Sequence, residues 1–480
     1  MKDVSLKKNV ILNVIKQVLS IAFPLITFPY VSRILLEDNY GKYSFGLSIA
    51  NYVTILAALG IQSYAVREGA RIRDNPPALN RLSCELYTVN LITTLLSYGA
   101  LGVALLLWDK LRDYQILILV QCSSVIFTTL GANWVNSIFE DYEYMTKRYI
   151  FVKIVSLILI FAFVREREDY ILYAAIIAAS DILANLINIV YIRRYVRLRP
   201  VWNCRFFQHI RPILILFANI LAVTIYANLA ITLMGIFCTD AEVGIYSFSS
   251  KIYQIAKNLI NAIIIVMIPR FSRYLGVGDM DAYNRLLKKT IRCIVAFMMP
   301  MIAGIIMLSQ ELILFLGGNN YLEGQLALKL MSLALIPASL GSIFFDGVLI
   351  ANRKEKYCVI SMLWGVGVNL SGNLLLIPRF GMTGSALAAI ISELVSFGFA
   401  FWYSRGLCDR PLKLGKDYLS VAVGVAAVVL SCILVKGLQW GLLPTIAACV
   451  ALSVAAYGVV LLVLRNSVCQ MVLASVFKKR

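Results

Sequence analysis

The chain has 480 residues, of which 60% are hydrophobic and 15% are charged, and it carries a formal net charge of +19 at pH 7. Soluble domains contain about 45–50% apolar and about 25% charged residues, so this composition excludes a sizeable soluble domain and predicts a polytopic membrane protein. The positive charge calls for no nucleic-acid partner, because basic residues collect in the cytoplasmic loops of membrane proteins.

Cysteine and histidine usage argues against several kinds of site. The ten cysteines are scattered, none forms a CxxC pair, and His209 is the only histidine. Zinc sites and histidine-based catalytic triads need these residues in groups. We therefore expect no metal site, no cofactor and no enzyme activity.

Apolar windows of about 17–25 residues predict membrane-spanning helices. About fourteen such windows follow one another, and the first is expected to be a retained span because no signal-peptide cleavage pattern accompanies it. The expected spans are 10–33, 42–66, 82–107, 114–139, 149–164, 170–192, 211–236, 244–268, 290–316, 325–350, 357–377, 383–403, 417–435 and 442–464. The predicted fold is an all-α polytopic bundle without an external catalytic domain.

The distribution of basic residues predicts the orientation of this bundle. By our count about 32 of the 45 Lys and Arg lie in one set of alternating loops and tails, and about 8 lie on the opposite side. Positively charged loops stay in the cytoplasm. Both termini are therefore expected to be cytoplasmic.

An internal repeat relates the two halves of the chain. GKYSFGLSI at 41–49 returns as GIYSFSSKI at 244–252, and ALNRL at 78–82 returns as AYNRL at 282–286. AAIIAASD at 174–181 has a weaker echo in AAIISE at 388–393. Each echo is displaced by six spans, so both copies cross the membrane in the same direction, as in the parallel repeats of transporters.

This repeat predicts three parts of the chain and one type of mechanism. Residues 1–204 would form an N-terminal lobe of six helices, residues 205–408 a C-terminal lobe of six helices, and residues 409–480 two additional helices with a basic cytoplasmic tail. Two such lobes around a central cavity are typical of alternating access, in which rocking exposes one site to each side in turn.

Three lysines are candidates for a cationic cavity. Lys257 lies near the middle of the eighth span, Lys251 lies on the same helix, and Lys16 lies in the first span. A charge at the centre of the bilayer costs about 2.5–3.5 kcal/mol, which makes a functional role the default reading. A cationic cavity predicts an anionic cargo.

Polar residues at helical spacing accompany the lysines. Residues 247, 251, 254, 258 and 261 share one face of the eighth span, and a shorter uncharged stripe lies on the second span. The candidate polar lining of a water-filled cavity is Ser48, Asn51, Ser247, Gln254, Asn258 and Asn261. Hydrogen bonding between helices of the bundle is the alternative explanation for such a stripe.

Two acids and two prolines complete the candidate site. Asp181 and Glu393 take matching mid-span positions in the repeat, and they are candidate proton-coupling acids or structural partners of the lysines or of the backbone. Pro24 and Pro29 each remove a backbone hydrogen bond from the first span, which makes that helix a candidate gating element.

The stretch NLSGNLLLIPRFGMTGSALAAIISE at 369–393 resembles a signature of the oligosaccharide flippases, the Wzx-like branch of the multidrug/oligosaccharidyl-lipid/polysaccharide exporter superfamily. PRFS at 269–272 and WVNSIFEDYEYMTKRYIFVK at 134–153 resemble further family motifs, and the resemblance covers roughly residues 1–405. The signature positions are Asn369, Asn373, Ile377, Pro378, Gly381, Gly384, Ser385, Ala386, Ser392 and Glu393. The acidic run at 140–143 departs from the family's usual basic linker, which leaves the role of that loop open.

The resemblance implies translocation of undecaprenyl-pyrophosphate-linked oligosaccharide repeat units across a bacterial cytoplasmic (inner) membrane, for O-antigen or other surface polysaccharide synthesis. It implies membrane lipid and the lipid-linked oligosaccharide as partners, with a polysaccharide polymerase and a chain-length regulator as further candidates. Lysines at mid-depth would neutralise the pyrophosphate, and Ser, Asn and Gln would hydrogen-bond the sugars.

Other functions stay open at this point. A lipid II flippase has the same helix number and an anionic cargo. A cation-coupled multidrug exporter would need acids for a cationic cargo, so Lys251 and Lys257 count against it while Asp181 and Glu393 keep it open. A membrane polymerase or ligase would need a large outward loop with catalytic residues, and the predicted outward loops are short.

Overall fold

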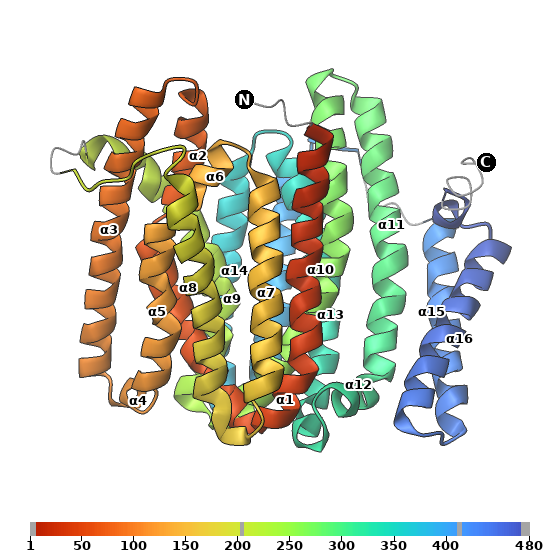
Figure 1. The fold of residues 1–480 in the computed structure, drawn as a ribbon. Helices are drawn as coiled ribbons and strands as arrows, with labels where there is room; N and C mark the ends of the chain where they lie inside the picture. Colours follow the sequence, from red (N-terminus) through yellow and green to blue (C-terminus); the bar gives the residue numbers. More distant parts are fainter. Residues whose placement is uncertain (1–5, 202–205, 410–414, 472–480) are drawn as a thin grey trace. The chain divides into compact units, whose positions relative to one another are not determined.

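The computed structural model describes residues 6–201, 206–409 and 415–471. These residues form two compact units, residues 1–244 and residues 245–480. Apart from one isolated bridge between Arg405 and Cys408, the described secondary structure is helical (Figure 1). The prediction of an all-α polytopic membrane protein is therefore confirmed.

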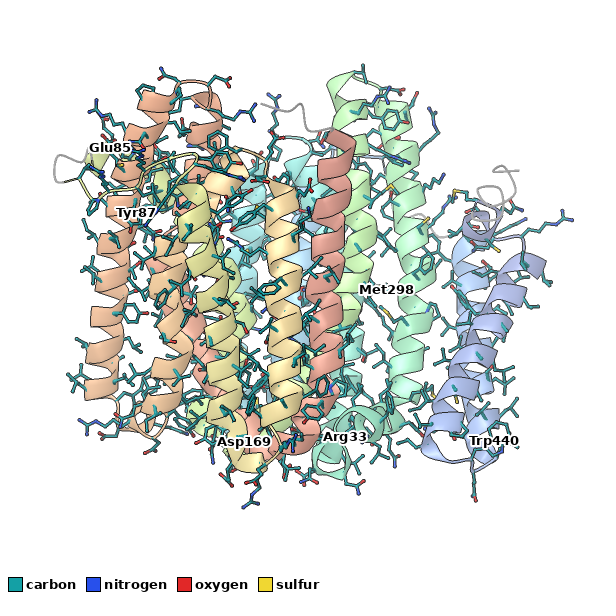
Figure 2. All side chains as sticks on the ribbon, in the orientation of Figure 1. Arg33, Glu85, Tyr87, Asp169, Met298 and Trp440 are labelled. Atoms are coloured by element: carbon teal, nitrogen blue, oxygen red, sulfur yellow. The ribbon has the colours of Figure 1, made fainter. Side chains whose placement is uncertain are left out.

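Unit 1 contains ten helices and the first turn of an eleventh within the described ranges. They are α1 (Leu6–Ala58), α2 (Ile61–Arg71), α3 (Pro76–Leu107), α4 (Asp109–Arg112), α5 (Gln115–Gly131), α6 (Trp134–Ile138), α7 (Tyr142–Phe163), η1 (Arg167–Asp169), α8 (Tyr170–Ile192), α9 (Phe206–Phe237) and the start of α10 (Asp240–Gly276). Figure 2 places Glu85 of α3 and Asp169 of η1 at opposite ends of the helices of this unit.

Unit 2 contains the remainder of α10 and the helices that follow. They are α11 (Met280–Met307), α12 (Ser309–Leu316), η2 (Asn319–Gly324), α13 (Gln325–Ser342), η3 (Ile343–Ile350), α14 (Glu355–Tyr403), α15 (Lys416–Gly437) and α16 (Leu442–Val463). The segment η3 continues α13 as a π-helix.

Ten segments of the described chain are long and apolar enough to cross a membrane, and α5 is a shorter apolar helix. Two of the ten segments are 49 residues long, which is about twice the length that one span needs. Each of these two contains a non-helical residue, Leu36 in α1 and Gly381 in α14. Both breaks fall between spans that the hydropathy pattern separates, so α1 together with α2 covers two of the expected spans, and α14 covers two others.

The break in α14 follows from its glycines. Gly381 has φ 51° and ψ −132°, which side chains with a Cβ rarely adopt. A Cβ on Gly384 would lie 2.3 Å from the carbonyl oxygen of Leu376. The chain can therefore turn and the two arms of α14 can pack closely only because both positions are glycine.

The repeated GxYSF motif places glycine where α1 meets the first turn of α10. A Cβ on Gly41 would lie 1.8 Å from the carbonyl oxygen of Asp240, and a Cβ on Gly244 would lie 1.8 Å from that of Glu37. All four residues belong to unit 1. At each glycine the backbone of the other helix occupies the space that a Cβ would fill. Small residues permit such close approach of helices in membranes.

The phenylalanines of the two motifs make related contacts within their own units. Phe45 packs edge-on against Tyr114, just before α5, with ring centroids 5.0 Å apart. Phe248 stacks on Tyr321, just before α13, at 4.4 Å. In the expected order of spans, α5 and α13 are six spans apart, which is the displacement that the predicted repeat requires.

The last two helices form a hairpin that docks on α11 and α12. Arg292 pairs with Asp417 at 3.1 Å near one end, and Lys436 pairs with Glu311 at 2.7 Å near the other. Between them the Tyr457 hydroxyl donates to the Ala296 carbonyl at 2.6 Å. The hairpin is therefore held on unit 2 by polar contacts near both ends as well as by apolar packing.

Candidate functional site

The predicted cation Lys257 and the predicted acid Glu393 meet in unit 2. Lys257 Nζ lies 2.8 Å from Glu393 Oε1 and donates a hydrogen bond to it. The Tyr253 hydroxyl donates to the same oxygen at 3.3 Å. The lysine side chain is 26% exposed and the glutamate side chain 11% exposed, so the cation is the more accessible partner.

The signature around Asn369 explains why Glu393 is held in place. Asn369 Nδ2 donates to Ser392 Oγ at 3.1 Å, and Ser385 Oγ donates to Asn373 Oδ1 at 2.8 Å. These bonds join the two arms of α14 on either side of its break. Because Glu393 directly follows Ser392, its backbone is fixed by this polar ladder.

Lys251 differs from Lys257. It is half-buried on α10, and among the residues that the structure describes no acid pairs with it. A cation without an acidic partner inside a membrane span is costly and marks a functional position. That Lys251 binds an anionic cargo stays a prediction.

The polar stripe of α10 is partly exposed. Gln254 and Asn258 are exposed, and Gln254 donates to Ser250 Oγ at 3.3 Å. The Ser247 hydroxyl and Asn261 Oδ1 are buried, and neither has a hydrogen-bond partner in the described part of the chain. The structure thus presents two of the four predicted polar residues on the surface of the helix.

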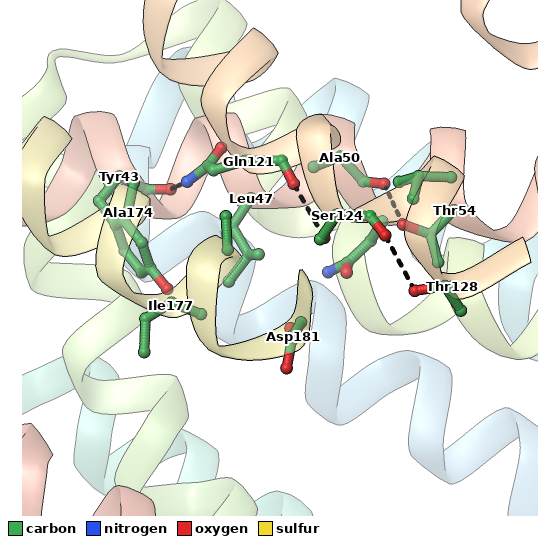
Figure 3. A pocket seen from close by; sticks show the side chains of 13 residues that line it. Tyr43, Leu47, Ala50, Thr54, Gln121, Ser124, Thr128, Ala174, Ile177 and Asp181 are labelled. Carbon is green, nitrogen blue, oxygen red and sulfur yellow. Dashed lines mark hydrogen bonds between the residues drawn. The ribbon is translucent and has the colours of Figure 1, made fainter. Parts of the chain in front are cut away.

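Unit 1 contains a polar cavity of about 210 Å³ (Figure 3). Its lining comes from α1, α5 and α8, and comprises Tyr43, Leu47, Ala50, Asn51, Thr54, Gln121, Ser124, Val125, Thr128, Ala174, Ile177, Ala178 and Asp181. Thr54 and Thr128 are exposed, so the cavity is open. Its hydroxyl, amide and carboxylate groups can both donate and accept hydrogen bonds.

Asp181 lies at this cavity and has its own lysine. Lys153 Nζ of α7 lies 3.7 Å from Asp181 Oδ1, and the Asp181 side chain is 49% exposed. The lysine also lies over the rings of Phe23 and Tyr149, 5.4 Å and 5.8 Å from their centroids. Both candidate coupling acids are thus partners of lysines, and the contact is looser in unit 1.

The predicted stripe on the second span hydrogen-bonds to α9. Asn51 Nδ2 donates to Asn228 Oδ1 at 2.9 Å and also lines the cavity. Ser48 is 1% exposed and accepts a hydrogen bond from Thr232 Oγ1 at 3.0 Å. Asn51 is accessible to a ligand, whereas Ser48 joins two helices.

The remaining predicted residues lie in α1. Lys16 falls within the helix, but its side chain lies outside the described residues. Pro24 and Pro29 are both inside α1, and the backbone leaves helical geometry at Leu36, seven residues after Pro29. A gating role of the two prolines stays a prediction.

Sequence reasoning missed several residues of this region. Asp346 lies in the π-helix η3 of unit 2, and its carboxylate has no ion pair within the described chain. π-helices are frequent at functional sites, but a short π-helical stretch has no sequence signature. Asn228 and Thr232 were also missed, although they lie one turn apart on α9 and that spacing was a readable signal.

The fold and the mid-span charges define the class of this protein, a membrane transporter. The chain belongs to the family described as polysaccharide biosynthesis protein, whose model matches residues 6–275, and it is a Wzx-like flippase of the multidrug/oligosaccharidyl-lipid/polysaccharide exporter superfamily. A second model, described as lipid II flippase MurJ, matches residues 149–452. The predicted family resemblance is therefore confirmed.

Individual proteins agree with this assignment. The chain is 21% identical to the "Putative O-antigen transporter" of Escherichia coli (strain K12) over 401 residues, which is 81% of this chain and 94% of that protein. A solved inward closed structure of lipid II flippase MurJ matches with a TM-score of 0.67 and 14% identity over 92% of this chain and 99% of that one.

A multidrug resistance transporter of the MATE family in an inward-facing conformation shares the fold as well. It matches with a TM-score of 0.57 and 13% identity, and the match covers 79% of this chain and 96% of that one. At such low identity these two structural matches establish the fold and leave the cargo to the chemistry of the site.

Proposed function

We propose that this flippase moves undecaprenyl-pyrophosphate-linked oligosaccharide repeat units from the cytoplasmic to the outer leaflet of a bacterial inner membrane by alternating access. The product would supply O-antigen or another surface polysaccharide. The observation that carries the proposal is the pair of mid-span lysines on α10, of which Lys251 lacks an acidic partner among the described residues. Such cations favour an anionic cargo such as a pyrophosphate.

Different residues would bind the pyrophosphate and the sugars of the cargo. Lys251 and Lys257 would hold the pyrophosphate, with Lys16 as an additional cation, because ammonium groups bind phosphate oxygens as point charges. Asn51, Gln254 and Asn258 would hydrogen-bond sugar hydroxyls, since all three side chains are accessible. The lobes would correspond to residues 1–204 and 205–408, and both termini would lie in the cytoplasm. A polysaccharide polymerase and a chain-length regulator would be the expected partners.

The test measures the leaflet in which a labelled undecaprenyl-pyrophosphate oligosaccharide resides in proteoliposomes. We expect the wild type to move the label and Lys257→Ala to slow it by about tenfold, because a hydrogen bond to a charged group contributes about 1.5–3 kcal/mol. Lys257→Glu should be slower still, because it adds a repelling charge. Lys436→Ala is the matched control, since Lys436 also pairs with a glutamate of unit 2 but on the C-terminal hairpin.

Equal movement by wild type, Lys257→Ala and Lys257→Glu would contradict the site and leave the flippase function intact. A lipid II flippase is the second candidate, favoured by the family model that matches residues 149–452. It is separated by offering lipid II in the same vesicles. Movement of lipid II alone would select it, whereas efflux of a cationic dye without lipid movement would select a multidrug exporter.

A further inference from the structure

Lys257, which we propose as a cargo-binding lysine of unit 2, is already paired with an acid of the protein. Lys257 Nζ donates to Glu393 Oε1 at 2.8 Å, and this oxygen also accepts a bond from the Tyr253 hydroxyl. The glutamate side chain is 11% exposed, whereas the lysine side chain is 26% exposed. The lysine is therefore the more accessible side chain of the pair.

A pyrophosphate cannot simply be added to this pair. It would bring negative charge beside the Glu393 carboxylate, and like charges in a poorly solvated site repel strongly. The repulsion ends when the carboxylate leaves the lysine or becomes neutral. A carboxylate that loses its cation inside a membrane span is costly as an anion, so uptake of a proton is the low-energy outcome.

We propose that Glu393 is a displaceable counter-ion and a proton-binding site: it neutralises Lys257 in the empty protein, gives way to the pyrophosphate of the cargo, and takes up one proton from water as it does so. The ammonium group keeps its three protons throughout, and the carboxylate becomes a neutral carboxylic acid. The inference rests on the proposed function, because it needs an anionic cargo at Lys257.

Tyr253 suits this exchange. Its hydroxyl lies one turn before Lys257 on α10 and reaches Glu393 without using the lysine. A hydroxyl can donate to a carboxylate and accept from a carboxylic acid, so it can hold Glu393 in both protonation states. Tyr253 is therefore a positioning residue for the displaced carboxyl group.

Other ionisable groups in the neighbourhood do not take the place of Lys257. The ionisable groups on residues 246–264 of α10, on α13 and on η3 are Tyr246, Lys251, Tyr253, Lys257, Lys329 and Asp346. Among the contacts of described residues, Lys257 and Tyr253 are the two that reach the Glu393 carboxylate. A proton gained when the pair opens is therefore assigned to Glu393.

The chain offers a matched control in the same unit. Glu311 pairs with Lys436 at 2.7 Å and is 13% exposed, which closely resembles the Glu393 pair. Lys436 also donates to the Met307 carbonyl at 2.8 Å, which ties the C-terminal hairpin to the end of α11. Glu311→Gln thus removes the same charge from a similar environment without touching the proposed site.

The experiment measures binding of farnesyl pyrophosphate to the purified full-length protein in detergent by isothermal titration calorimetry. Titrations at pH 7.5 in buffers of different ionisation enthalpy give the number of protons taken up per bound ligand. We expect Glu393→Gln to bind about tenfold more tightly than wild type and to take up about one proton fewer. Protonation of the ligand itself cancels in this comparison.

Glu311→Gln should match the wild type in both quantities, and Lys257→Gln should bind about tenfold more weakly. Glu393→Asp keeps the charge on a shorter side chain, so it should keep the proton uptake. This variant decides the question if Glu393→Gln does not fold.

The two proposals fail in different ways. If Lys257→Gln binds as well as the wild type, the anionic cargo site at Lys257 is wrong and the proposed function loses its main support. If Lys257→Gln binds weakly but Glu393→Gln neither binds more tightly nor changes the proton uptake, the cargo site stands and the counter-ion exchange is overturned. Loss of the proton uptake in Glu393→Asp would also overturn the counter-ion exchange.

Discussion

One carboxylate, that of Asp141, connects two helices of unit 1 from a position in a loop. Asp141 lies in the acidic run at 140–143, directly before the first residue of α7. Its side chain caps α7 through the amide of Tyr144 and accepts hydrogen bonds from Tyr191, Arg194 and Tyr195. Asp141 therefore has a structural role, because it joins the start of α7 to the end of α8.

Replacing Asp141 should cost far more than replacing its neighbour Glu143. Asp141→Ala removes a helix cap and several bonds to one carboxylate, and we expect the free energy of unfolding to fall by about 2–4 kcal/mol. Glu143 forms an exposed pair with Lys147 at 2.7 Å, so Glu143→Ala should cost less than about 1 kcal/mol. Thermal unfolding in detergent measures both, and equal losses would contradict this role of Asp141.

Glycines permit a helix break and a close contact between two helices in this protein. Gly381 permits the break of α14, and Gly41 and Gly244 allow α1 and the first turn of α10 to approach. Other glycines have no such contact: a Cβ on Gly99 of α3 would meet no atom within 4 Å. The same substitution should therefore have opposite effects at different places along the chain.

Gly41→Ala places a methyl group 1.8 Å from the Asp240 carbonyl oxygen, so the helices must move apart. We expect the free energy of unfolding to fall by about 1–3 kcal/mol. Gly99→Ala should leave stability unchanged or raise it by up to about 1 kcal/mol, because alanine favours the helix. Thermal unfolding of the two variants side by side checks this, and equal destabilisation would contradict the close approach at Gly41.

At the scale of the whole molecule, the orientation in the membrane follows from charge. The segment η2 and the connection between η3 and α14 lie at opposite ends of the span Asn319–Ile350. If the basic connections are cytoplasmic, η2 is extracytoplasmic and the connection that contains Lys354 is cytoplasmic. Asn320 and Lys354 are both exposed, so single cysteines there can report the sidedness.

We expect a membrane-impermeant maleimide to label Asn320→Cys in intact cells and Lys354→Cys only after permeabilisation. Two native loop thiols should interfere little. Burial raises the pKa of Cys238 to about 11, with Glu242 adding to the effect, and burial likewise raises the pKa of Cys408 to about 11. Because the thiolate is the reactive form, both should react slowly at pH 7 and about tenfold faster for each unit of pH up to that value.

The unsubstituted protein gives the background in this labelling experiment. Labelling of Lys354→Cys in intact cells, with Asn320→Cys protected, would reverse the orientation. It would also contradict the cytoplasmic position of both termini.

The sequence alone determined the class of fold and most of its spans. The physical reason is that a bilayer demands about twenty apolar residues for each crossing, and such windows are visible in a single chain. The expected spans 357–377 and 383–403 also leave a gap around Gly381, and glycine permits a geometry there that other residues avoid. A mid-span lysine such as Lys257 could also be singled out from the sequence, because a charge inside the bilayer is costly and needs an explanation.

Only the tertiary structure decided which groups meet. Glu393 is 136 residues from Lys257 along the chain, and Asp181 is paired with Lys153, which the hydropathy pattern placed near the end of a span. The π-helix around Asp346 and the four contacts of Asp141 likewise depend on neighbouring helices. Spacing along one helix shows which residues share a face, but the partner of that face is set by packing between helices, which one sequence does not record.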